Sequence, residues 1–114
     1  MAQSGTETVI CIYRVREDSQ DEFLGLLERH WPTLRSLGLA SETPPRHFRG
    51  AEQSGEPLFV EIFEWASAEA AGTAHAHPEV MAIWEPMDAL TETRDGRPNM
   101  EFPHVQPLDV LAAA

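Results

Sequence analysis

Residues 58–65, LFVEIFEW, decide the fold. Aromatic and branched aliphatic side chains dominate this segment, which predicts a β-strand. The turn-forming sequence SGEP at 54–57 precedes it and predicts a hairpin with an irregular strand over 45–52. Ser67 follows closely and can cap a helix. We therefore expect a strand, a turn, a second strand and a helix in this part of the chain.

The flanking segments extend this pattern in both directions. Residues 8–15, TVICIYRV, predict a first strand, and Ser19 with Glu22 forms a capping-box pattern for a helix that ends at Gly38. A weak, alanine-rich helix should follow Ser67 and resume at Pro78. Residues 100–108 predict a last strand, restricted to an edge or bulge by its prolines.

The resulting order is β-α-β-β-α-β. It predicts a ferredoxin-like α+β fold, with a four-stranded antiparallel sheet and two helices on one face, in a single domain over 1–114. The segments TVICIY and LFV place apolar side chains on both faces of their strands. Because no further segment can cover the second face, we expect a homodimer in which another copy of the sheet covers it.

Composition excludes several partners. The chain has 8 basic and 19 acidic residues and a formal net charge of -11, which disfavours nucleic acid and anionic membranes. The pairs Arg46/Arg49 and Arg94/Arg97 are expected to be solvated. The single Cys11, together with the lack of a signal peptide pattern and of a 20-residue apolar run, predicts a cytoplasmic protein.

The stretch LFVEIFEWASAEAAGTAHAHPEVMAIWE over 58–85 carries a motif. A strand ends at Trp65 and Ser67, a histidine follows the tryptophan by ten residues at His75, and the helix resumes at Pro78. In this motif the chain resembles the antibiotic biosynthesis monooxygenase family of dimeric α/β barrels. That family includes cofactor-independent oxygenases of polyketide-like aromatics, heme-degrading enzymes, quinol oxygenases and members without known chemistry. The resemblance implies a cleft between sheet and helices, lined by asparagine, tryptophan, tyrosine or histidine.

The chain departs from the heme-degrading branch. Its only asparagine is Asn99, and alignment on the helix restart puts Ala74 at that branch's tryptophan and Trp84 at its heme-ligating histidine. The resemblance therefore implies no heme, and we expect no cofactor.

Three residues are candidate general bases: His75, His30 and Glu61. His30 falls in the apolar stripe of the first helix, so it faces the core or the cleft. Glu61 interrupts a buried strand, where burial would raise its pKa. The alternatives are ordinary hydrogen-bonded histidines and a carboxylate at a sheet edge or dimer rim.

Three aromatic residues and one histidine are candidates for substrate binding: Trp65, Phe63, Trp84 and His47. For the aromatic residues core packing is the alternative, and the direction of His47 depends on strand register. His75 and His77 would share a face on a strand but not on a helix, so no metal site is expected. Cys11 lacks an activating neighbour and should be a structural thiol.

Two functions stay open. The first is a small-molecule-binding homodimer that resembles cofactor-independent monooxygenases and oxidises a planar aromatic substrate. The second is a non-catalytic, stress-responsive or regulatory barrel, favoured by the absence of the family's asparagine.

Overall fold

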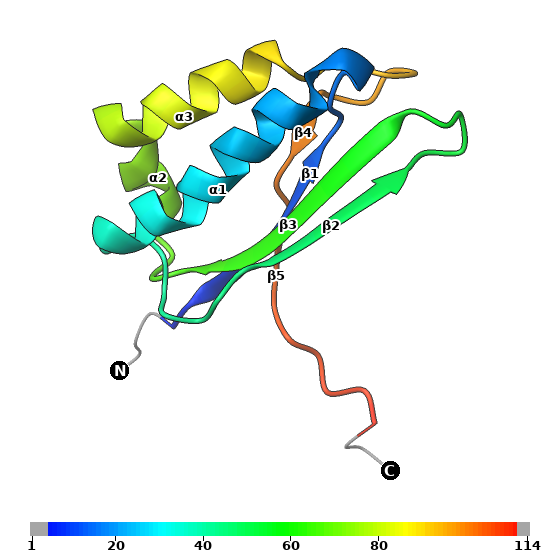
Figure 1. Cartoon of the computed structure of the whole chain (residues 1–114). Coiled ribbons are helices and arrows are strands. Elements are labelled where there is room, and N and C mark those ends of the chain that lie inside the picture. Colours follow the sequence, from blue (N-terminus) through cyan, green and yellow to red (C-terminus); the bar gives the residue numbers. More distant parts are fainter. Residues whose placement is uncertain (1–4, 112–114) are drawn as a thin grey trace.

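One antiparallel sheet carries all of the helices on a single face (Figure 1). The computed structural model describes residues 5–111. Its elements are β1 (Glu7–Tyr13), a 3-10 turn (Glu17–Ser19), α1 (Gln20–Ser36), β2 (Arg46–Ala51), β3 (Pro57–Trp65), α2 (Ala70–His75), α3 (Pro78–Ala89), β4 (Met100–Glu101) and β5 (His104–Val105).

The strand order is β2-β3-β1-β4, with β5 also paired to β1 and every pairing antiparallel. This confirms the predicted ferredoxin-like arrangement. The register sets Cys11 of β1 opposite Glu61 of β3, and Glu61 opposite His47 of β2. Residues paired across antiparallel strands share a face, so these three side chains form a row across the sheet beneath the helices.

The predicted last strand over 100–108 is divided in two. Phe102 and Pro103 separate β4 from β5, so the sheet has five strands rather than four among residues 5–111. Pro103 has no N–H to donate to a ladder, but its carbonyl still accepts a hydrogen bond from the Ile10 N–H at 3.0 Å. The proline interrupts the strand while this edge stays attached to β1.

The start of α1 differs from the predicted capping box. The Ser19 hydroxyl donates to the Asp18 carboxylate at 3.2 Å and makes no capping bond to the helix. A 3-10 turn leads into the helix, and the Ser19 N–H is already bonded to the Arg16 carbonyl. Beyond the other end of α1, Gly38 has a φ of +77°, the left-handed conformation that suits a glycine stop.

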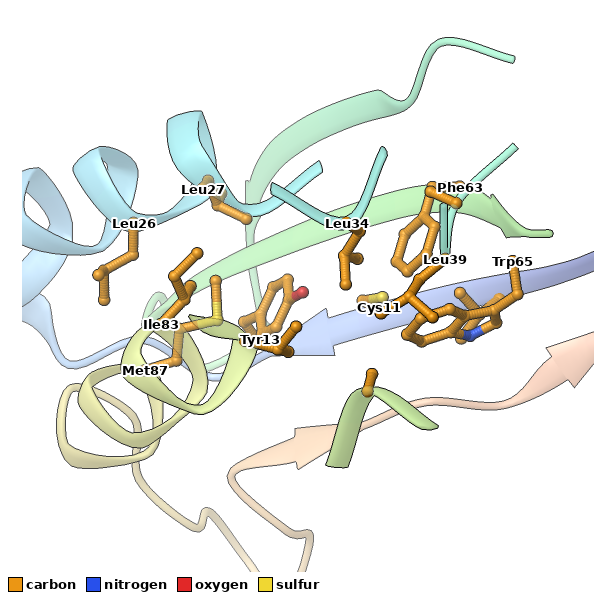
Figure 2. Packing of buried hydrophobic residues seen from close by; sticks show 14 of the residues in the cluster. Cys11, Tyr13, Leu26, Leu27, Leu34, Leu39, Phe63, Trp65, Ile83 and Met87 are labelled. Carbon is orange, nitrogen blue, oxygen red and sulfur yellow. The ribbon is translucent and has the colours of Figure 1, made fainter. Parts of the chain in front are cut away.

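The core lies between the helices and the facing side of the sheet (Figure 2). Along β3 the residues alternate between buried and half-buried, so one face packs under the helices while the other is partly open. The second face carries apolar side chains: Ile10, Ile12, Val60 and Ile62 are half-buried, and Phe48 is 44% exposed. This is the two-sided apolar pattern predicted from the sequence.

One arginine is not where the sequence suggested. Arg94 was expected on the solvated surface, but it is 7% exposed. Its guanidinium donates to the buried carbonyls of Val15 at 2.6 Å and Pro57 at 2.7 Å. Arg46, Arg49 and Arg97 are exposed, as expected.

Candidate functional site

A cavity of about 190 Å³ lies between the sheet and the helices. Strands β1 and β3 form its floor, α1, α2 and α3 its walls, and the segment that carries β4 and β5 its remaining side. Its surface is almost entirely apolar and aromatic. The lining residues are Val9, Cys11, Tyr13, His30, Phe63, Trp65, Ala71, His75, Trp84, Met87, Met100, Phe102 and His104.

Glu61 lies at the centre of a hydrogen-bonded cluster beside this cavity. Its carboxylate is fully buried, and Oε1 accepts from the Tyr13 hydroxyl and from His30 Nδ1, each at 2.8 Å. Oε2 is bonded to His47 Nε2 at 2.9 Å. Tyr13 and His30 line the cavity, whereas Glu61 lies behind them. The three donors come from β1, α1 and β2, so the fold itself assembles the cluster.

The expectation that burial raises the pKa of Glu61 is wrong. Burial does act in that direction, but the hydrogen bonds from His30, His47 and Tyr13 outweigh it and lower the pKa to about 2. Glu61 is therefore a carboxylate at neutral pH. An anion this well satisfied is a weak base and a strong orienting group.

The partners of His30 define its tautomer. The Trp84 indole Nε1–H, which can only donate, is 2.8 Å from His30 Nε2. His30 Nε2 is therefore an acceptor, and the ring proton is on Nδ1, from which it is donated to Glu61. His30 is 2% exposed and neutral in this arrangement. A buried carboxylate behind a neutral imidazole is the arrangement that orients a histidine for proton transfer.

The other candidate residues are divided between the cavity and its surroundings. Phe63, Trp65, Trp84 and His75 all line the cavity. His75 is exposed at the rim and meets the Trp84 ring edge-on at 4.8 Å between centroids. It does not join the Glu61 cluster, so the three base candidates do not converge on one point.

His47 lies outside the cavity. Its side chain is 41% exposed and lines a separate, open groove with Leu24, Leu27, Glu28, Phe48, Arg49 and Phe59. The hydrogen bond to Glu61 connects this groove to the cluster. Hydrogen bonding to Glu61 raises the pKa of His47 above its usual value.

Trp65 has a polar atom without a partner. The indole Nε1 of this residue is buried and has no hydrogen-bond acceptor within the described residues, although the side chain is 4% exposed and lines the cavity. An unpaired buried donor is costly, and this one belongs to a side chain that lines the cavity.

Sequence reasoning missed Tyr13 as a site residue. Tyr13 is fully buried, lines the cavity and donates to Glu61. It lies two residues beyond Cys11, so strand alternation put both on one face, but the contact with Glu61 depends on the pairing of β1 with β3. Burial raises the pKa of Cys11 and of Tyr13 well above their usual values, so both stay protonated.

Within residues 5–111, no three histidine, cysteine, aspartate or glutamate side chains gather as metal ligands would. His75 belongs to α2, while His77 occupies the N-cap position of α3 without a side-chain capping bond, and its Nδ1 lies 3.9 Å from a Glu79 carboxylate oxygen. None of the helices in this part of the chain is both long and apolar enough to cross a bilayer.

Several solved structures have the same architecture. SnoaB, a cofactor-independent oxygenase from Streptomyces nogalater, is 18% identical, with a TM-score of 0.65 over 95% of this chain and 98% of that one. An antibiotic biosynthesis monooxygenase is 16% identical, with a TM-score of 0.67 over 90% and 99%. The chain has the fold of the antibiotic biosynthesis monooxygenases. This confirms the resemblance at the level of fold.

The same fold also serves other proteins. A NIPSNAP family protein from Agrobacterium tumefaciens is 17% identical, with a TM-score of 0.62 over 100% of this chain and 96% of that one. The sequence matches no protein-family model and no curated protein. Any activity must therefore be argued from the cavity and the Glu61 cluster.

Proposed function

We propose that this protein binds a planar aromatic molecule in the cavity and oxidises it with molecular oxygen, without a bound cofactor. The observation that carries the proposal is a neutral imidazole, His30, oriented by a buried carboxylate at the wall of an otherwise apolar cavity. SnoaB, a cofactor-independent oxygenase, offers a precedent for such a reaction on this fold.

The size and lining of the cavity suit an aromatic ring. An engineered apolar cavity of about 150 Å³ holds benzene, so a cavity of about 190 Å³ has room for one ring. His75, Phe102 and His104 are exposed at the rim. A larger polycyclic substrate would insert one ring and extend past these residues into solvent. An oxygen on the inserted ring could accept from the unpaired Trp65 Nε1.

Oxygenation without a cofactor requires a substrate that readily forms an anion. His30 Nε2 would accept the proton, and Glu61 would stabilise the resulting imidazolium through Nδ1. The substrate anion would transfer electrons to O₂ and form a C–O bond, and the imidazolium would return the proton to give a hydroperoxide. The overall change is RH + O₂ to ROOH. For this to occur, the Trp84 N–H must leave His30 Nε2 when substrate binds.

The position of Trp84 also favours a second function. As long as the Trp84 N–H occupies His30 Nε2, no free base faces the cavity from His30. A protein that keeps this bond in the ligand complex would bind an aromatic molecule without reacting with it. That is the non-catalytic, regulatory function left open by the sequence.

The two functions are separated with anthrone, a planar tricyclic ketone whose central CH₂ is acidic. Oxygen uptake would be measured in the presence of a chelator and compared with buffer alone. Catalysis predicts uptake by the wild type and a loss on the order of a hundredfold in His30→Gln, with anthrone still bound. Binding without uptake by the wild type would favour the regulatory function. If anthrone and smaller phenols such as 1-naphthol do not bind at all, the cavity is not a site for planar aromatics.

We also propose that the functional unit is a homodimer formed through the sheet face opposite the helices. In a single chain Ile10, Ile12, Val60 and Ile62 are only half-buried there, and Phe48 is exposed. Burial of such a patch favours association. Sedimentation at micromolar concentration should give a mass near twice 12.7 kDa, and Phe48→Glu should shift it toward one copy. A wild-type protein that sediments as a monomer would contradict this arrangement.

A further inference from the structure

Glu61 is bonded to two histidines, one at each carboxylate oxygen, and these histidines differ in their access to solvent. On the cavity side, His30 is 2% exposed; on the groove side, the His47 side chain is 41% exposed. Both are within hydrogen-bonding distance of the carboxylate, at 2.8 and 2.9 Å. His47 can therefore exchange protons with solvent, while His30 senses the result only through Glu61.

His30 and His47 also differ in their freedom to change charge. Protonation of His30 on Nε2 would disrupt its bond from the Trp84 N–H. Protonation of His47 requires no such change, because Nε2 can donate to Glu61 in both the neutral and the charged ring. His47 is thus the member of the cluster that can titrate without rearrangement.

Other titratable and charged groups near Glu61 do not take over the role of His47. The groups that face Glu61 are Tyr13 and Cys11 from β1, His30 from α1 and His47 from β2. Tyr13 and Cys11 stay neutral. In the groove, His47 lies with Glu28 and Arg49, whose charges oppose one another. Of these groups, His47 is the one that can gain or lose a proton while every hydrogen bond of the cluster is kept.

We propose that His47 is a positioning residue that controls, through Glu61, how readily His30 accepts a proton from a ligand in the cavity. A protonated His47 neutralises the carboxylate and leaves less negative charge to stabilise a His30 imidazolium. A neutral His47 leaves the full charge of Glu61 to His30. The proton affinity of His30 therefore rises as His47 loses its proton. This inference rests on the proposed role of His30 as proton acceptor.

The coupling can be measured without a substrate, by long-range ¹H–¹⁵N spectra of the imidazole rings over a pH titration of the whole protein. The ¹⁵N resonances of His30 should shift at the midpoint of His47. In His47→Gln, which keeps a donor to Glu61 but has no titratable charge, that step should vanish. His77→Gln, which removes a histidine outside both the cavity and the cluster, should leave it unchanged. If the ¹⁵N chemical shifts of His30 in the wild type do not change at the pH where His47 titrates, the proposal is wrong.

A second pair of variants tests the functional consequence in opposite directions. If the wild type oxidises anthrone, its rate should rise with pH through the His47 midpoint, by on the order of tenfold for one pKa unit of coupling. His47→Gln should show the high rate at all these pH values, and His47→Lys, with a permanent positive charge, the low rate. Unchanged pH profiles in both folded variants would reject the role of His47 and leave the oxidation itself standing. A wild type without oxidation would remove the proposed function, and the spectra would still decide whether His47 and His30 are coupled.

Discussion

The structure buries charge in two clusters, and they differ in what surrounds the charge. Arg14, Arg94 and Glu52 form the first, in which Glu52 lies 3.1 Å from Arg14 and 3.4 Å from Arg94. Its cations are always charged and also donate to main-chain carbonyls. None of its three residues lines the cavity beside Glu61 or the groove of His47. The second is Glu61 with Tyr13, His30 and His47, whose donors include two groups that can change protonation.

This difference separates a structural cluster from a candidate functional one. Fixed opposite charges with satisfied carbonyls hold the β2–β3 hairpin and the segment around Arg94 together. A carboxylate held by histidines beside a cavity has a charge environment that solvent or ligand can alter. Both clusters bury a carboxylate, so burial alone does not distinguish them. They differ in the residues that pair with the carboxylate, which are arginines in one cluster and histidines in the other.

The largest expected effect is the loss of an arginine from the first cluster. Arg94→Met should lower the free energy of unfolding by about 3–5 kcal/mol, because it leaves two buried carbonyls without their donor and removes one of the cations that offset the charge of Glu52. Arg97→Met is the matched control, since Arg97 is exposed and makes a 3.4 Å contact to the same Glu52; it should cost at most about 1 kcal/mol. Urea unfolding measures both. Equal losses in the two variants would mean that burial adds nothing to this cluster.

In the second cluster, the charge of Glu61 should stabilise the fold in a pH-dependent way. Its pKa falls from 4.5 to about 2 on folding, so the stabilisation is present above pH 4.5 and is lost as the pH falls toward 2. At neutral pH the charge of Glu61 should stabilise the fold by on the order of 3 kcal/mol. Glu61→Gln should remove this part of the acid sensitivity, measured as the wild-type-minus-variant difference in unfolding free energy from pH 7 to 2. A difference that stays constant with pH would show that the carboxylate is not preferentially stabilised.

The architecture could be predicted from sequence because it depends on local patterns. LFVEIFEW, TVICIYRV and the stop at Gly38 each act within a few residues, and the predicted element order follows. The errors concern particular hydrogen bonds that residue types do not specify. The Ser19 hydroxyl is bonded to Asp18 and makes no capping bond, and its N–H is taken by Arg16 rather than by Glu22. Pro103 splits the last strand while its carbonyl still bonds to β1.

The site was predictable as a set of residue types but not as an arrangement. His30 and Glu61 were identified from their position in apolar stretches. Their contact joins residues 31 positions apart, and the contact between Glu61 and Tyr13 spans 48. The direction of the Glu61 pKa depends on those donors, so burial alone gave the wrong sign. Arg94 was misplaced for the same reason, because the carbonyls that bury it lie 37 and 79 residues away.

At the rim of the cavity, a histidine outside both clusters should matter for binding but little for stability. His75 is exposed and contacts the Trp84 ring edge-on, so His75→Ala should cost less than about 1 kcal/mol. It should weaken binding of 1-naphthol several-fold, read from tryptophan fluorescence. Thr73→Ala, on the same helix and outside the cavity lining, is the control. A destabilised His75→Ala variant with unchanged affinity would assign His75 to the structure rather than to the cavity.

The smallest expected effect on stability is that of His47, and it has the opposite pH sign to that of Glu61. Because the folded-state pKa of His47 is raised above 6.5, its contribution is fully present below pH 6.5 and is lost as the pH rises through the folded value. The side chain is 41% exposed, so solvent screening keeps this contribution well below about 1 kcal/mol. Urea midpoints measured upward from pH 6 should therefore decline slightly in the wild type and in His77→Gln, and not in His47→Gln. If His47→Gln kept the wild-type decline, the group that titrates would be a residue other than His47. The Glu61 cluster would then have no solvent-exposed residue whose charge changes in this pH range, and it would differ less from the cluster around Glu52.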